Sequence, residues 1–234
     1  MNILSRDTLA LGGFAGIVEH RLVTDSRVFG NRKKPETFEG FGNMVYLADA
    51  KYKPHGTSGM HSHSEIDVIS IIVEGRVSHE GSMEHGKDLI AGDVQVQRAG
   101  GDGFSHDEIN PDGAENRMLQ VWVLPEEKGQ SASYKAYVLQ QKGRTRIYGG
   151  NKFQQATFDS HTLIDIVNLK KGEKIDLDRE GLIYIVTGAA LVSEPTEAYE
   201  RDATRVQEGD LILSQTLQLT GQSDLQLLIV SKAT

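Results

Sequence analysis

The sequence predicts an all-β protein, and three observations lead to this prediction. Short runs of β-branched and other apolar residues are each bounded by Gly, Pro, Asn or Asp, as β-strands are. No long stretch shows helical periodicity. The 25 glycines spread along the chain suit tight turns and bulges. Such chains form barrels or sandwiches, and the clearest strands are expected at residues 43–47, 68–73, 94–96 and 118–123.

A weak internal repeat predicts that the barrel is duplicated. In the first half, residues 71–77 give an apolar strand, a Gly turn and a return strand, and a Gly-Asp turn follows at 92–93. The second half repeats this order at 184–190 and 209–210. Coincidence is the alternative, because Gly-Asp turns are frequent in any β protein, but the shared order favours duplication. Each half then closes on an apolar strand, at residues 119–124 and 225–230.

Polar segments mark the boundary between the two halves. Residues 125–133 and 140–151 are rich in Gly, Ser, Gln and charged side chains. Segments of this composition connect domains more often than they form a core. We therefore expect an N-terminal barrel at residues 1–135 and a C-terminal barrel at residues 136–234.

Composition excludes several classes of function. The 234 residues include no cysteine, which rules out disulfides, zinc–thiolate sites and cysteine nucleophiles and suits a reducing compartment. The net charge of −8 argues against nucleic-acid binding, because phosphate contacts need clustered Lys and Arg. Neither a signal peptide nor a run of eighteen apolar residues is evident. We expect a cytoplasmic monomer that binds neither nucleic acid nor a membrane.

Two histidine-containing triplets predict a metal site. His61-Ser62-His63 and His106-Asp107-Glu108 each place two ligand side chains at positions i and i+2, which share one face of a β-strand. Two such strands would present three imidazoles and one carboxylate to one point, a set that suits a divalent transition metal. The alternative for an isolated His-x-His is a solvated loop. The crowding of histidines favours the metal, since five of the eight lie within residues 55–85.

The two halves differ in the ligands they offer. The second half contains only His161, and its strands carry acidic residues where the first half carries histidines. We therefore expect the N-terminal barrel alone to bind metal and the C-terminal barrel to be structural. The acidic residues in question are Asp176, Asp178 and Glu180.

Residues 60–129 resemble the pirin family of the cupin superfamily. HSHSEIDVISIIVEG, from His61, resembles the family's His-Pro-His segment with its following strand and Glu-Gly turn. AGDVQVQRAGGDGFSHDEIN, from Ala91, is similar to the family's Gly-Asp strand, Gly-rich turn and His-x-Glu. LQVWVLPEEKG, from Leu119, matches its Trp strand and Pro-Glu turn. Ser62 and Asp67 depart from the family's Pro and Glu, and the family's N-terminal aromatic signature is missing, so substrate preference transfers least.

The resemblance implies a bicupin fold, with two packed β-barrels of the RmlC-like jelly-roll type. It places the four metal ligands at His61, His63, His106 and Glu108. The implied cofactor is one divalent transition metal, Fe(II) first, with Zn, Ni, Cu or Mn as alternatives. The implied activity is that of a quercetin 2,3-dioxygenase, which cleaves quercetin-like flavonols with O2. A regulatory module that binds a protein partner and a non-redox cupin that binds a small molecule are the alternatives.

Several roles near the predicted site stay open from sequence alone. Glu108 is predicted as the catalytic residue, a general base for the flavonol hydroxyl, with plain ligation as the equal alternative. Asp67 either holds a ligand imidazole or lies in water. Trp122 is expected in the core. Met60 and Met118 either line the pocket or fill the core, and the histidines expected at the surface are His55, His79 and His85.

Overall fold

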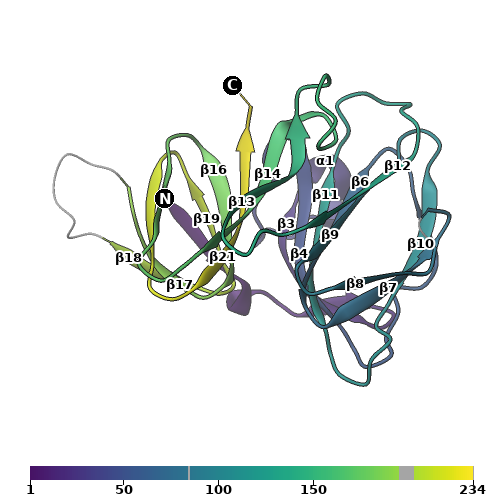
Figure 1. Ribbon diagram of the computed structural model, residues 1–234, viewed down its shortest axis with the longest axis horizontal. Helices are drawn as coiled ribbons and strands as arrows, with labels where there is room; N and C mark the ends of the chain where they lie inside the picture. The colour runs from purple at the N-terminus through teal and green to yellow at the C-terminus, as the bar shows by residue number, and fades with distance from the viewer. Residues whose placement is uncertain (84, 195–202, 234) are drawn as a thin grey trace. The chain divides into compact units, whose positions relative to one another are not determined.

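Two compact units make up the chain, one of residues Leu9–Leu139 and one of Met1–Thr8 together with Gln140–Thr234. The structure is a computed structural model and describes residues 1–83, 85–194 and 203–233. Strands dominate both units, and helix in the described residues is confined to three short segments (Figure 1). The all-β prediction is confirmed. The helical segments are η1 (Arg6–Thr8), α1 (Ser26–Phe29) and η2 (Gly30–Arg32).

The N-terminal unit contains a seven-stranded and a four-stranded sheet. The larger sheet has the order β12-β9-β6-β11-β4-β3-β2 and the smaller one β5-β10-β7-β8, and the neighbouring strands in both orders pair antiparallel. The strands are β2 (Gly12–Phe14), β3 (Ile17–Thr24), β4 (Met44–Tyr52), β5 (His61–His63), β6 (Asp67–Glu74), β7 (Arg76–Gly81), β8 (Lys87–Ile90), β9 (Asp93–Arg98), β10 (Phe104–Ile109), β11 (Arg117–Val123) and β12 (Ser133–Val138).

Strand β6 shows how the sequence sets this core. Its residues from Asp67 to Ile72 are all buried, so the strand is covered on both faces and its sequence runs apolar without alternation. The interruptions are Asp67 and Ser70, both 0% exposed. A polar side chain inside such a run needs a hydrogen-bond partner. Both residues have one, as described below.

The C-terminal unit repeats this architecture. Its sheets have the orders β1-β19-β16-β21-β14-β13 and β15-β20-β17-β18. Adding ten to the label of each N-terminal strand from β3 to β11 reproduces these orders, apart from β1, so the predicted duplication is confirmed. The strands are β1 (Asn2–Ser5), β13 (Gly143–Gly150), β14 (Ser160–Leu169), β15 (Lys174–Leu177), β16 (Gly181–Thr187), β17 (Ala189–Ser193), β18 (Thr204–Gln207), β19 (Asp210–Ser214), β20 (Leu217–Gly221) and β21 (Leu225–Lys232).

The first eight residues belong with the second half of the chain. Strand β1 pairs antiparallel with β19, from Asn2 opposite Leu213 to Ser5 opposite Asp210. It therefore takes in the C-terminal unit the edge position that β12 takes in the N-terminal unit. The sequence division assigned these residues to a barrel of residues 1–135. The difference arises because the paired strands are about two hundred residues apart in the chain, so no local sequence pattern indicates the pairing.

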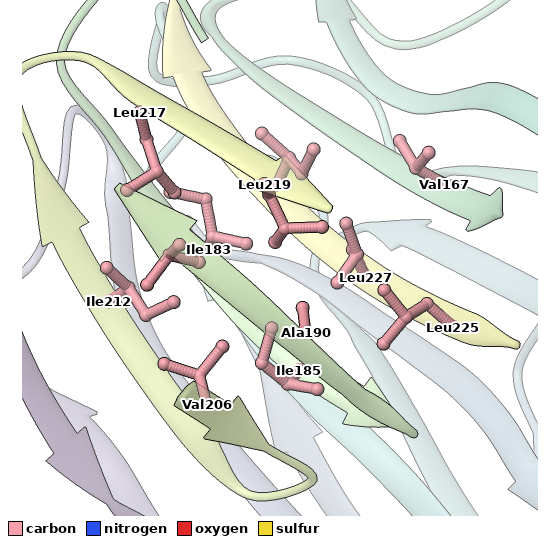
Figure 2. Close-up of a cluster of buried hydrophobic side chains, with 12 residues drawn as sticks. Val167, Ile183, Ile185, Ala190, Val206, Ile212, Leu217, Leu219, Leu225 and Leu227 are labelled. Atoms are coloured by element: carbon pink, nitrogen blue, oxygen red, sulfur yellow. The ribbon is translucent and has the colours of Figure 1, made fainter. Parts of the chain in front are cut away.

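Aliphatic side chains fill the interior of the C-terminal unit (Figure 2). In the repeated strand order, β15 and β20 take the places of β5 and β10, the two strands that carry the histidine triplets. Their paired inward residues are Ile175 with Leu219 and Leu177 with Leu217, all packed in this core. Asp176 lies between them, exposed and bonded to Gln218. The acidic residues of this segment thus lie off the inward positions, which offer no ligand atoms.

None of the described helices has the length and apolar character that crossing a membrane requires. The cytoplasmic location and the monomeric state remain predictions.

Candidate metal centre

Pairing of β5 with β10 brings the two histidine triplets together. His61 lies opposite His106, and His63 lies opposite Phe104. Ligand atoms of His61, His63 and His106 all lie within 4.8 Å of one another. The His61 and His106 Nε2 atoms are 3.2 Å apart. The three imidazoles predicted from spacing therefore converge on one point.

A glycine turn positions β10 for this pairing. Gly100 has a φ of 53°, and a Cβ there would lie 1.9 Å from the Gln130 carbonyl oxygen. Only glycine fits such a left-handed position against backbone. The loop before β5 is tied to β10 as well, because Ser58 N–H donates to the Glu108 carbonyl at 2.9 Å and Glu108 N–H donates to Ser58 Oγ at 3.0 Å.

Hydrogen bonding prepares His61 as a ligand. Its Nδ1 lies 2.7 Å from the Gly59 carbonyl oxygen. Because a carbonyl can only accept, Nδ1 carries the proton and the Nε2 lone pair faces the cluster. Backbone carbonyls orient metal-ligating imidazoles in this way. The Nε2 atom of His106 lies 3.2 Å from that of His61, and the two imidazoles could together hold a divalent ion, so the donor set fits a metal.

Burial keeps the other two imidazoles neutral. Desolvation, assisted by the neighbouring histidines, lowers the pKa of His63 to about 3 and that of His106 to about 3. Neutral imidazole is the form that binds metal. At neutral pH both side chains are therefore in the ligating form before any ion arrives.

The metal-free protein should lose stability as the pH falls below 6.5. The pKa of His106 is about 3 in the folded protein, whereas the ordinary value of 6.5 applies to the unfolded chain. Between these two pH values the unfolded chain binds more protons than the folded one, so acid favours unfolding. For this 1% exposed side chain the loss is at most about 1.4 kcal/mol per pH unit. Urea unfolding of metal-free protein at pH 7 and 4.5 measures it. His106→Gln should flatten the profile, and identical profiles for variant and wild type would contradict the assignment.

Glu108 lies in the same cavity but outside the histidine cluster. It is 2% exposed and faces His79 across the pairing of β10 with β7. Three donors hold its carboxylate. Tyr52 Oη donates to Oε2 at 3.0 Å, and Oε1 accepts from Ser70 Oγ at 2.5 Å and from Gln95 Nε2 at 2.7 Å. Burial and the Glu108 charge raise the pKa of Tyr52 well above its usual value, so its hydroxyl stays protonated and donates.

Other residues singled out from the sequence lie elsewhere than expected. Asp67 is buried and its carboxylate oxygen Oδ2 lies 3.0 Å from Arg98 Nε, so the prediction of a solvated carboxylate was wrong. His79 is 0% exposed, not at the surface, and Gln97 Nε2 donates to it at 3.0 Å. Met60 is 59% exposed, outside the cavity.

Aromatic side chains form a wall of the cavity. The Tyr46 and Trp122 rings lie 4.5 Å apart, and Phe29 stacks on both. Trp122 is half-buried, and its ring centroid lies 5.8 Å from that of His63. It therefore lines the cavity and does not lie wholly in the core. Phe14 adds a 47% exposed ring from β2. This wall is suited to a flat aromatic ligand.

Sequence reasoning missed the polar residues that surround Glu108. Tyr52, Ser70 and Gln95 lie on β4, β6 and β9, between 13 and 56 residues from Glu108. No motif spacing links them. The available signal was a polar residue inside a buried strand, such as Ser70 in VISIIV, because such a residue must bond to something inside.

Comparison with known proteins agrees with this site. The sequence profile described as Pirin matches residues 22–123. A Zymomonas mobilis protein with the provisional name quercetin 2,3-dioxygenase is 28% identical over 81% of this chain and 82% of its own length. The Escherichia coli K12 protein named quercetin 2,3-dioxygenase is 32% identical over 45% of this chain and 46% of its own. Within residues 22–123, the chain is therefore similar to the pirin family.

The solved structure of a bacterial pirin from Escherichia coli in complex with nickel(II) shows the same fold. It has a TM-score of 0.81 with 18% identity and covers 100% of this chain and 99% of its own. The bicupin prediction is thus confirmed. The family match lies within the N-terminal unit, where the three histidines converge.

Proposed function

We propose that this protein binds one divalent transition metal and oxidises a flavonol-like aromatic with O2. The observation that carries the proposal is the convergence of three imidazoles, two of them held neutral by burial, in a cavity with an aromatic wall. His61, His63 and His106 would hold the ion. Relatives named quercetin 2,3-dioxygenase support the substrate class.

Fe(II) is the proposed physiological ion. Imidazole ligands suit Fe, Ni, Cu and Zn alike, so the ion in a purified sample reflects availability as well as affinity. The nickel(II) in the Escherichia coli pirin is consistent with such a donor set. When bound, the ion supplies Lewis-acid and redox chemistry at the substrate oxygens.

Glu108 is the proposed general base. Its carboxylate lies in the cavity with the histidines and accepts three hydrogen bonds, from Tyr52, Ser70 and Gln95. A carboxylate so fixed can accept the proton of a substrate hydroxyl without first having to reorient. The ring wall of Tyr46 and Trp122 would orient the flat substrate and exclude water. Ligation of the ion by Glu108 is the alternative role, and the two are separated below.

Oxygen uptake tests the proposal. Fe(II)-loaded protein is expected to consume O2 when quercetin is added and to remain silent with a flavone that lacks the 3-hydroxyl. The 3-hydroxyl carries the proton that Glu108 would accept. An oxygen electrode measures the rate, with metal-free protein as the control. Fully Fe(II)-loaded protein that consumes no O2 with any flavonol would overturn the proposal and favour a regulatory role.

A further inference from the structure

A second buried carboxylate faces the cavity from the larger sheet. Glu19 lies on β3, opposite Ala50 of β4, and is 3% exposed while lining the same cavity as the histidines. The histidines come from the smaller sheet. A ligand held in the cavity can therefore touch both sheets. The metal chemistry does not require Glu19 there.

The contacts of Glu19 fix the orientation of its carboxylate. Arg21 Nε and Nη2 both donate to Oε1 at 2.7 Å. Tyr46 Oη donates to Oε2 at 2.7 Å. Burial, with the Glu19 charge, raises the pKa of Tyr46 well above its usual value, so this hydroxyl stays protonated. Both oxygens are thus held in place, and the pair with Arg21 compensates the buried charge.

An acceptor position remains on this carboxylate. An ionised carboxylate offers about four lone-pair sites. Arg21 occupies the two on Oε1 and Tyr46 one of the two on Oε2. The remaining site can accept from a donor that enters the cavity. It would repel an anion and accept from an O–H or N–H donor.

Gln120 supplies a polar amide on the neighbouring surface. It lies on β11 between Met118 and Trp122, and all three line the cavity. Within the part of the chain that the structure describes, no hydrogen bond joins its side chain to another residue, and it is only half-buried. An amide can both donate and accept. It is therefore available to a ligand hydroxyl.

We propose that Glu19 and Gln120 recognise a phenolic hydroxyl of the substrate, away from the end directed to the metal. The substrate class is then a planar polyphenol, because a ring without further hydroxyls would leave the remaining acceptor position of Glu19 and the Gln120 amide unused. This inference rests on the proposed function, which supplies the metal-directed end. A buried site built to bond a hydroxyl discriminates against analogues that lack it.

Trp122 provides the readout. It is the single tryptophan of the chain and lines the cavity, so its fluorescence reports a bound ligand directly. Ni(II)-loaded protein kept free of O2 is titrated with quercetin and with 3-hydroxyflavone, which lacks the other hydroxyls. Glu19→Gln should weaken quercetin binding about tenfold or more, the scale of a hydrogen bond to a charged group. Its affinity for 3-hydroxyflavone should stay within about twofold of wild type.

Controls separate the possible outcomes. Glu36→Gln changes an exposed glutamate of the same unit and should alter neither affinity. Gln120→Met keeps the side-chain length and should also weaken quercetin selectively, which keeps the test decisive where Glu19→Gln fails to fold. Equal effects on both ligands, or none on either, in a folded variant would refute the recognition pair alone. Failure of wild type to bind any flavonol would refute the proposed function and this inference with it.

Discussion

Replacing His61 and His106 together by alanine is expected to leave this protein with almost no bound divalent metal. The two Nε2 atoms lie 3.2 Å apart and supply two of the three converging ring nitrogens. His63 would then remain as the sole imidazole of the cluster, and one imidazole holds a divalent ion only weakly. Element analysis after equilibration with Fe(II), Ni(II) or Zn(II) and gel filtration measures the loss.

A matched pair of substitutions controls for the general loss of histidine. His55 and His85 are both exposed and outside the cavity. The His55→Ala/His85→Ala protein should keep one ion per chain, whichever metal is offered. One ion per chain retained by the His61→Ala/His106→Ala protein would refute the assignment. A normal circular dichroism spectrum of that variant excludes unfolding as the cause of a loss.

The period of the β-strand explains why the histidines could be predicted. Residues at i and i+2 share a face whatever the fold around them, so His61 and His63 had to point together once they lay in a strand. The pairing of β5 with β10 was not local information. It was predictable only because each triplet carried two ligand residues, and a metal requires them to meet.

Spacing along the strand does not predict the contacts of the Glu108 side chain. Glu108 shares a strand face with His106, but its side chain bonds to Tyr52, Ser70 and Gln95. Spacing defines a face, whereas the final direction of a long side chain depends on its partners. Those partners come from three strands of the other sheet, which no motif connects to β10.

The C-terminal unit shows a second limit. The exposed Asp176 and the inward Ile175 and Leu177 differ by one position in a strand. A shift of one residue along a strand exchanges its two faces. The interpretation that Asp176 takes the place of a histidine was therefore wrong by one residue, because Ile175 and Leu177 hold the inward positions. The conclusion that the inward positions are not ligands still follows, from the aliphatic residues that occupy them.

Changing Glu108 to Gln is expected to reduce flavonol turnover by about 10²–10⁴-fold, the usual range for loss of a general base. The amide keeps the shape and one oxygen but cannot accept a proton. With the amide oxygen in the place of Oε1, Ser70 Oγ and Gln95 Nε2 can still donate to it, and Tyr52 Oη can accept from the amide N–H, so the cavity should persist. Metal content should fall only modestly, because the three imidazoles converge without Glu108.

Measuring turnover and metal content on the same preparation of Glu108→Gln separates base from ligand. A ligand role predicts that both fall together and recover with excess Fe(II), whereas a base role predicts a loss of turnover that added metal does not restore. Tyr52→Phe is the matched control, since it removes the 3.0 Å hydrogen bond to Oε2 and leaves the carboxylate in place. It should lower turnover less than Glu108→Gln does. Full recovery of Glu108→Gln activity by Fe(II) would exclude the base and make Glu108 the fourth ligand, as the histidine triplet pattern alone suggests.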